Sequence, residues 1–239
     1  MVKTFKALSL LLSYPTAEIQ AAAADLKQAL AREALVPAQL QGRLADLCDQ
    51  LAKRDLIDLQ ERYVLLFDRT RSLSLHLFEH VHGQSRDRGQ AMVDLMDLYA
   101  RHGLTIAARE LPDHLPLFLE FLSILPVDAA RTHLAQIGHI VKAIAQRLDK
   151  RRSVYGAVFA ALQALAAGRP SQGDLDALRD QPDDDPSDLM ALDASWQDAP
   201  VTFGPPAAGM TAPGNACPAA RATLALMDGG GAMRRSHDD

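Results

Sequence analysis

Cysteine and aromatic residues are both scarce in this chain of 239 residues. Its two cysteines, Cys48 and Cys217, lie far apart in the sequence, and two thiols in this much chain do not make a disulfide framework. A reduced, cytoplasmic protein is therefore the simplest interpretation. Aromatic residues make up 5% of the sequence, and β-branched residues are few beside alanine and leucine. This composition favours α-helices over β-strands.

The sequence also lacks long apolar runs and the glycine-rich motifs of common enzyme classes. The most apolar stretch, residues 115–125, is shorter than the roughly 20 residues that span a membrane. Residues 1–14 carry Lys3 and Lys6 before a short apolar run, with no small-residue cleavage site, so we interpret them as a first helix rather than a signal peptide. No phosphate loop, dinucleotide fingerprint or Ser-His-Asp arrangement is present. The sequence thus offers none of these catalytic or nucleotide-binding patterns.

Charge and composition change sharply after residue 168. Residues 169–239 hold 8 of the 13 prolines and 7 of the 14 glycines, and their net charge is −7, whereas the whole chain carries −5. Residues 1–168 therefore carry +2, which gives no case for nucleic-acid binding. An acidic segment rich in proline and glycine cannot bury enough apolar surface to offset its ordering entropy. We expect a helical domain at 1–168 and a mostly disordered tail at 169–239, with 196–204 as a candidate docking patch.

Apolar periodicity predicts a single all-α domain of about eight helices. After Pro116, the segment 110–125 is apolar on almost every side, which is typical of a helix buried among others. We place Pro112 at the first position of this helix, where its missing N–H costs nothing. The clearest amphipathic stripe, with spacings of 3, 4, 3 and 4, consists of Leu134, Ile137, Val141, Ile144 and Leu148.

A first polar cluster lies at residues 76–80, whose sequence His-Leu-Phe-Glu-His matches the H-x-x-E-H pattern of inverted zinc proteases. In a helix, His76, Glu79 and His80 would share one face, and two imidazoles four residues apart can bind one zinc ion. A pattern with three fixed positions also arises by chance, so ordinary polar residues are the simpler alternative.

A second polar cluster comprises Glu110, Asp113 and His114 at the start of the predicted core helix. These residues could cap that helix and compensate its dipole. They could instead form a polar rim beside an apolar groove that holds a partner helix. Their pattern alone leaves both interpretations open.

Residues 71–95, RSLSLHLFEHVHGQSRDRGQAMVDL, closely resemble the respiratory nitrate reductase assembly chaperones of the NarJ type. Residues 110–115, ELPDHL, and 118–122, FLEFL, resemble the same family and the E-x-x-D-H element of the wider TorD-like chaperones of molybdoenzymes. The opening residues 6–15 and the tail patch 196–204 agree as well. The resemblance covers about residues 2–165 plus that patch.

The resemblance implies a non-catalytic, all-helical cytoplasmic chaperone with no cofactor or metal of its own. Its client would be the N-terminal region of the catalytic (alpha) subunit of a membrane-associated nitrate reductase. The chaperone would hold this subunit while iron–sulfur clusters and the molybdenum cofactor are inserted, before docking on the membrane subunit. Molybdenum-cofactor delivery proteins are further expected partners, whereas nucleic acid and direct membrane insertion are not expected.

Eight residues carry over from the family motifs as client contacts or as determinants of groove geometry. They are His76, Glu79, His80, Arg86, Asp87, Glu110, Asp113 and His114. Two other interpretations stay open: a helical adaptor or regulator with no role in cofactor insertion, and a zinc metalloprotease acting through His76, Glu79 and His80.

Overall fold

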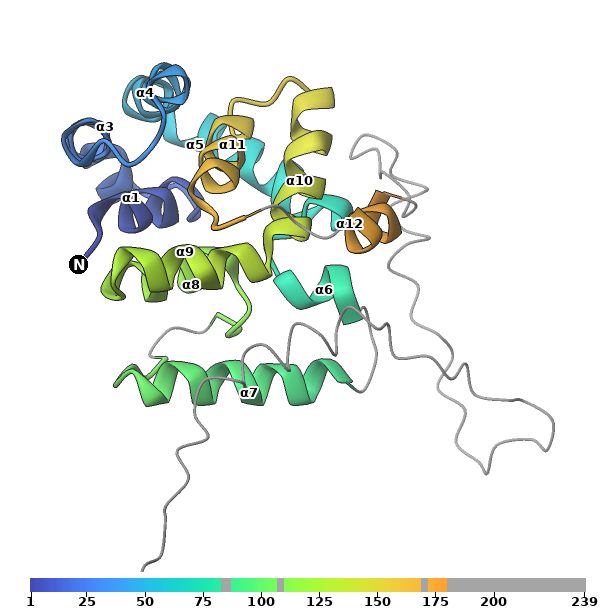
Figure 1. Ribbon diagram of the computed structural model, residues 1–239. Coiled ribbons are helices and arrows are strands. Elements are labelled where there is room, and N and C mark those ends of the chain that lie inside the picture. Colours follow the sequence, from blue (N-terminus) through green and yellow to red (C-terminus); the bar gives the residue numbers. More distant parts are fainter. Residues whose placement is uncertain (83–86, 107–109, 169–171, 180–239) are drawn as a thin grey trace, which may run out of the picture.

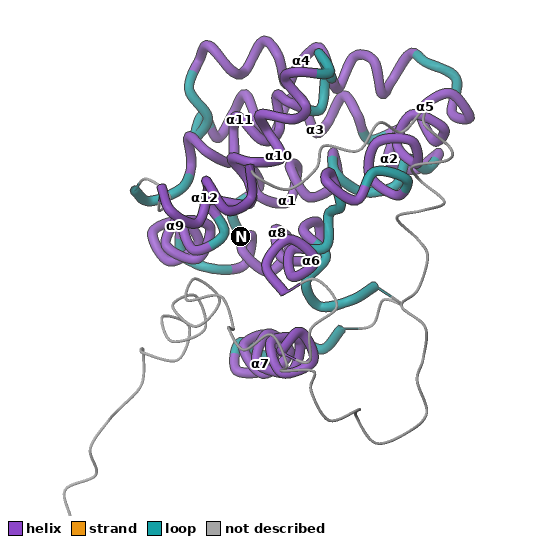
Figure 2. Tube along the Cα trace, turned by 90° about the vertical axis from the view of Figure 1, so that its right-hand side faces the viewer, coloured by secondary structure: helices purple, strands orange, loops and turns teal. Residues whose placement is uncertain are grey.

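The computed structural model describes residues 1–82, 87–106, 110–168 and 172–179. Their regular structure is helical, which confirms the predicted all-α class (Figures 1 and 2). The tail after residue 179, its patch 196–204 and Arg86 lie outside the described residues. The α-helices are α1 (Lys3–Leu11), α2 (Ala17–Ala21), α3 (Ala23–Glu33), α4 (Ala38–Lys53), α5 (Leu56–Tyr63), α6 (Leu77–His82), α7 (Asp87–Arg101), α8 (Leu115–Ile124), α9 (Val127–Gln136), α10 (Gly138–Lys150), α11 (Gly156–Leu165) and α12 (Gln172–Arg179).

These twelve described α-helices exceed the eight expected, because two long apolar patterns are divided by single turns and because α6 and α12 form where no helix was predicted. Ala22 separates α2 from α3, and Ile137 separates α9 from α10 with φ −95° and ψ 9°. Two short elements follow α5: the π-helix η1 (Val64–Asp68) and the 3₁₀-helix η2 (Arg71–Leu73). Within the described ranges, every helix is too short or too polar to traverse a lipid bilayer.

The core is built around α8, which packs along α1 although the two helices lie far apart in the sequence (Figure 1). Leu115, Phe118, Leu119, Phe121 and Leu122 of α8 are all buried, as its all-round apolar sequence predicts. The predicted start of this helix is wrong. It begins at Leu115, with Pro116 in its first turn, and Pro112 lies in the preceding loop.

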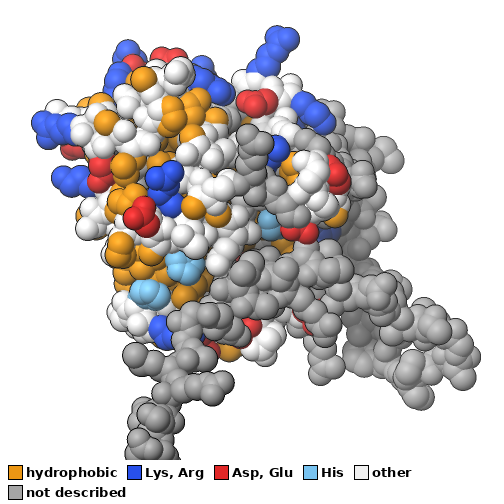
Figure 3. All heavy atoms as spheres, in the orientation of Figure 1, with side chains coloured by type: hydrophobic (Ala, Val, Ile, Leu, Met, Phe, Trp, Pro, Cys, Tyr) orange, Lys and Arg blue, Asp and Glu red, His pale blue; other side chains and the backbone are white. Residues whose placement is uncertain are grey.

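The other helices pack as pairs around this core. α3 lies against α4, and α10 lies against both α11 and α12, whereas α7 runs along one edge of the molecule (Figure 1). Lys and Arg side chains, with a few Asp and Glu between them, project around the α3–α4 end (Figure 3). α12 lies beyond residue 168, so the helical body extends past the boundary that we placed there, because Leu175 and Leu178 are buried.

An aromatic cluster joins α5 and η1 to the core. The Tyr63 ring lies edge-on to those of Tyr14 and Phe67, at centroid distances of 5.6 and 5.0 Å. The buried Tyr63 hydroxyl donates to the backbone oxygen of Leu12 at 2.9 Å. This bond ties α5 to the end of α1.

Removing this hydroxyl should destabilise the domain. Tyr63→Phe leaves the carbonyl of Leu12 without its buried donor, and we expect a loss of about 1–2 kcal/mol in the free energy of unfolding, measured by urea denaturation. Tyr14→Phe is the matched control, since Tyr14 is 45% exposed and its variant should change stability by less than about 0.5 kcal/mol. Equal effects of the two substitutions would contradict a structural role for the Tyr63 bond.

Candidate functional site

Two segments that are remote in the sequence meet beside α6 and α8. His76 and His114 form an isolated antiparallel bridge. The Leu77 amide donates to the Asp113 carbonyl at 3.0 Å, and the Leu115 amide donates to the Leu75 carbonyl at 2.8 Å. The structure therefore joins the two polar clusters predicted from the sequence, and it does so through the backbone.

Asp113 fastens this junction with its side chain. The carboxylate is fully buried, accepts from the Phe78 amide at 3.0 Å and accepts from His76 Nδ1 at 3.3 Å. Phe78 lies in the first turn of α6, so Asp113 caps α6 across the junction. Its predicted role as a cap of its own helix is wrong, because α8 has no side-chain cap.

The two histidines at the junction differ in their electrostatic environment, although their ring centroids are only 5.1 Å apart. The hydrogen bond to Asp113 raises the pKa of His76, which outweighs the opposing effect of its partial burial. Burial, helped by the nearby His76 and opposed by Glu110 and Asp113, lowers the pKa of His114 to about 4. At neutral pH, His114 is therefore uncharged, and any positive charge of the pair resides on His76.

The remaining acidic residues of the two clusters lie nearer to solvent. Glu110 is 4.0 Å from His114 Nδ1, and its side chain is 56% exposed. Glu79 on α6 lies 3.4 Å from Arg88 on α7. We define the rim as the four residues that line the junction and are at least partly exposed: His76, Glu79, Glu110 and His114.

Three predicted site residues within the described ranges do not belong to the rim: Asp113, whose contacts are given above, His80 and Asp87. His80 is buried and directs Nε2 to the Ser74 carbonyl at 2.8 Å, and its burial lowers its pKa. Asp87 is exposed at the first position of α7, where a carboxylate favours the helix dipole. His80 and Asp113 can therefore affect geometry, but a partner cannot contact them without a rearrangement.

The zinc alternative fails on geometry. His76 precedes α6 instead of sharing a helical face with Glu79 and His80. His76 directs Nδ1 at Asp113, whereas His80 directs Nε2 at a backbone carbonyl. Among the residues that the structure describes, no group of three His, Cys, Asp or Glu side chains is arranged to hold a metal ion.

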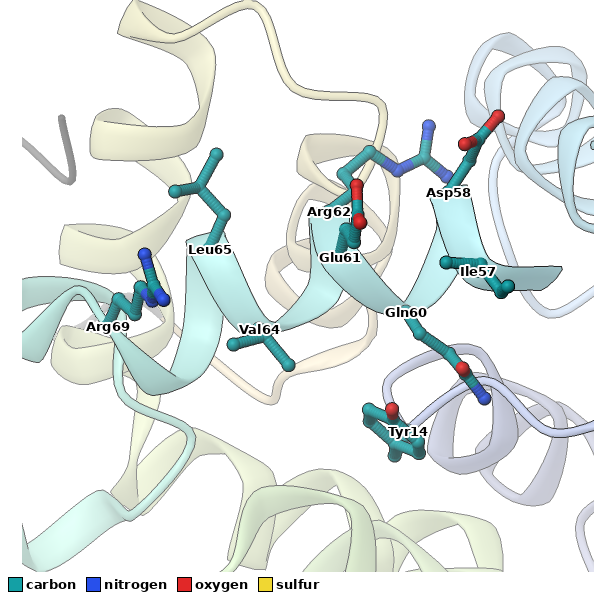
Figure 4. A pocket seen from close by; sticks show the side chains of 9 residues that line it. All are labelled: Tyr14, Ile57, Asp58, Gln60, Glu61, Arg62, Val64, Leu65 and Arg69. Carbon is teal, nitrogen blue, oxygen red and sulfur yellow. The ribbon is translucent and has the colours of Figure 1, made fainter. Parts of the chain in front are cut away.

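A groove of about 690 Å³ lies along α5 and η1 (Figure 4). Three large apolar side chains in it are unusually exposed: Tyr14 at 45%, Ile57 at 63% and Leu65 at 42%. Arg62 and Glu61 add charges of both signs. We define the groove by its lining residues, which are Tyr14, Ile57, Asp58, Gln60, Glu61, Arg62, Val64, Leu65 and Arg69.

Local interactions explain the shape of this groove. The side chain of Asp55 accepts from the Ile57 amide at 2.8 Å and starts α5. Gln60 Nε2 donates to the Pro15 carbonyl at 2.9 Å, which holds the loop carrying Tyr14 against α5. After Tyr63 the helix widens into η1, where the Arg69 amide donates to the Val64 carbonyl at 2.9 Å. Such π-helical turns are frequent at functional sites.

Asp68, the last residue of η1, precedes the groove residue Arg69 in the sequence. Burial raises the pKa of Asp68, and the charges of His76 and Glu110 act on the same carboxyl group, His76 lowering the pKa and Glu110 raising it. These interactions place Asp68 close to both rim residues. The charges of the rim therefore reach the end of η1, the segment that lines part of the groove.

The sequence did not identify Ile57 and Leu65 as functional residues. Both lie outside the buried stripe of Leu59, Tyr63, Leu66 and Phe67 that holds this stretch to the core. Large apolar residues that fall outside such a stripe are the signal that could have indicated them.

Comparison with known proteins places the chain among proteins linked to nitrate reductase. A family model described as nitrate reductase delta subunit matches residues 15–161. The nitrate reductase molybdenum cofactor assembly chaperone NarJ of Escherichia coli K12 is 42% identical over 196 residues, which cover 82% of each chain. NarW of the same organism, a probable chaperone of this kind, is 38% identical over 84% of each chain, and a Bacillus subtilis counterpart is 33% identical over 73% of this chain and 96% of its own.

A solved structure supports the fold. A crystal structure titled as a redox enzyme maturation protein from Archaeoglobus fulgidus aligns with a TM-score of 0.50. The alignment covers 68% of this chain and 91% of the other, at 21% sequence identity. The likeness extends the helical architecture to a distant protein.

Proposed function

Because this chain belongs to the nitrate reductase delta subunit family, we propose that it is a dedicated chaperone for the catalytic (alpha) subunit of a membrane-associated nitrate reductase. It binds the N-terminal segment of that subunit in the cytoplasm. There it keeps the apo-subunit competent for insertion of the molybdenum cofactor and iron–sulfur clusters, with the help of cofactor delivery proteins, until the subunit docks at the membrane. The names of the relatives from two bacteria support the cofactor-assembly part of this proposal.

The observation that carries the proposal is the exposed apolar groove along α5 and η1. Ile57 of α5, Leu65 of η1 and Tyr14 of the neighbouring loop offer exposed apolar surface in this groove. A volume of about 690 Å³ lies within the range of sites that take up a ligand the size of a few side chains. An amphipathic client helix can bury two or three apolar side chains there, as in other helix-in-groove complexes.

The rim gives this binding its register. We propose that the rim residues Glu79, Glu110 and His76 meet the polar face of the client helix, since each is at least partly exposed. Exposed charges of this kind contribute little affinity and mainly select orientation and partner. The apolar contacts therefore provide the affinity, and the polar rim provides the specificity. This division suits a complex that must later dissociate.

The proposal is tested by calorimetric titration with a synthetic peptide of the N-terminal residues of the client subunit. Burying an isoleucine or leucine contributes about 1.5–3 kcal/mol, so Ile57→Asp and Leu65→Asp should each weaken binding at least about tenfold. Both side chains are exposed, so thermal stability should hardly change.

Val93→Asp and Met96→Asp on α7 are the matched controls. Their side chains are 50% and 51% exposed, but they do not line the groove. Affinity should stay at the wild-type value in both. Absence of binding to the wild-type chain, or an equal loss in the α7 variants, would overturn the proposal.

A further inference from the structure

A buried arginine links α12 to the segment that precedes the rim. Arg147 on α10 is 5% exposed. Its Nη1 donates to the Ser72 carbonyl at 2.9 Å, and its Nη2 donates to the Leu178 carbonyl at 2.7 Å. One guanidinium thus joins the last turn of α12 to η2, because its planar fork presents donors in two directions.

Hydrogen bonds continue from η2 to the rim. Two residues after Ser72, the Ser74 carbonyl accepts from His80 Nε2 at 2.8 Å, and Ser74 Oγ accepts from the His76 amide at 3.2 Å. His76 then donates to Asp113 at 3.3 Å. The segment 72–80 is therefore held from one side by Arg147 and from the other by Asp113.

α12 itself is attached by two apolar side chains. Leu175 and Leu178 are 0% and 4% exposed, and the helix packs on α10 (Figure 1). A helix of eight residues is marginal without such contacts. Its docking is therefore a local equilibrium that can shift while the rest of the domain remains folded.

We propose that docking of α12 controls the conformation of the rim, with Arg147 as the positioning residue that transmits it. When α12 is docked, the guanidinium is held between Leu178 and Ser72, and the segment 72–80 keeps the geometry that presents His76. When α12 leaves, Arg147 loses its Leu178 acceptor, and its hold on Ser72 of η2 weakens. The rim then loosens, and the client is held less tightly.

The effect on client binding rests on the proposed function, whereas the coupling between α12 and the rim rests on the contacts described above. Coupling between sites is reciprocal, so a bound client should also hold α12 in place. The 60 residues that follow α12 are covalently attached to it. A partner that undocked α12 by binding these residues would therefore weaken the hold on the client.

The test compares Leu178→Asp with Ala177→Asp in the full chain. The two variants gain the same charge at neighbouring positions, but residue 178 is buried and residue 177 is exposed. Amide hydrogen exchange of Leu77 and Leu115, which donate across the junction, reports the rim directly. We expect their exchange to accelerate at least tenfold in Leu178→Asp and to be unchanged in Ala177→Asp, with the amides of α3 and α4 unaffected in both.

The titration of His76, followed by NMR, gives a second reading. The charged groups around His76 are Asp113, Glu79 and Arg88, with Asp68 and His114 close by, and neither substitution removes any of them. If the 72–80 segment loosens, the hydrogen bond to Asp113 weakens and the pKa of His76 falls toward its ordinary value. A general loss of stability in a domain that stays folded would leave this titration unchanged.

Arg147→Lys provides an independent variant, because lysine keeps the charge but has no fork to hold two carbonyls at once. Arg147→Lys should accelerate the amide exchange of Leu77 and Leu115 as Leu178→Asp does, although the sequence of α12 is unchanged. Wild-type exchange and titration in both Leu178→Asp and Arg147→Lys would overturn the coupling.

Client-peptide affinity is then measured on the same variants, and Leu178→Asp should bind at least threefold more weakly than Ala177→Asp. If the wild-type chain binds no peptide, the proposed function fails, and the exchange and titration still decide the coupling.

Discussion

Replacing Asp113 with alanine is expected to lower the free energy of unfolding by about 3 kcal/mol. The carboxylate is fully buried and accepts from the Phe78 amide and from His76 Nδ1. Hydrogen bonds to a charged group contribute about 1.5–3 kcal/mol, and an amide left unpaired in the interior adds a cost of its own. The substitution also removes the cap of α6, so the junction between the two segments should open first.

Urea denaturation at pH 7 measures this loss, and Glu110→Ala is the matched control. Glu110 lies three residues earlier, is 56% exposed on its side chain, and should change stability by less than about 0.5 kcal/mol. Asp113→Asn should fall between the two, because an amide oxygen can still accept from Phe78. A loss below 1 kcal/mol in Asp113→Ala would show that the junction is held by other contacts.

Acidification from pH 6.5 to pH 4 should cost up to about 3 kcal/mol through His114 alone. Burial lowers the pKa of His114 to about 4, against an ordinary value of 6.5. Between pH 6.5 and pH 4, His114 therefore binds a proton in the unfolded chain but not in the folded chain. The folded state loses stability as the pH falls through this range. His80 and His139 act in the same direction, because burial lowers their pKa as well.

His76 has the opposite sign. Its pKa is raised by Asp113, so its contribution is complete below pH 6.5 and disappears as the pH rises through the folded value. The two histidines thus act in different pH windows, His76 above pH 6.5 and His114 below it.

His114→Gln isolates the acidic effect. The difference in unfolding free energy between wild type and variant, measured by urea denaturation from pH 7 to pH 4, should shift by up to about 3 kcal/mol in favour of the variant. His80 and His139 remain in both proteins and cancel in this comparison. Parallel pH profiles for the two proteins would mean that His114 is not kept neutral by its surroundings.

Helical periodicity predicted the core better than it predicted the site. The apolar stripe at 134–148 and the all-round apolar run of α8 are visible in the sequence because burial imposes them residue by residue. The turn at Ile137 that divides the stripe was not predicted, since the apolar spacing continues through it. The start of α8 was misplaced because Asp113 is engaged by Phe78, a partner that no local pattern reveals.

The same limit applies to the candidate site. The polar types at 76–80 and 110–114 were identified from the sequence, but the contact between His76 and Asp113 spans 37 positions and depends on the packed helices. Burial separated residues that looked equivalent, since His80 is enclosed while His76 borders the surface. Ile57 and Leu65 were missed for a different reason: both fall outside the apolar stripe of their segment, and that signal was not used.

The pairing of α1 with α8 has a consequence for synthesis on the ribosome. α1 ends at Leu11, and its partner is complete only at Ile124, more than a hundred residues later. At the usual 5–20 residues per second, the apolar face of the first helix waits roughly 5–20 s for its partner to be made. During that interval Phe5, Leu8 and Leu11 have no α8 to cover them. Until α8 is made, α3 is the helix of this pair of neighbours that can cover part of α1, and the side of α1 that faces α8 stays open.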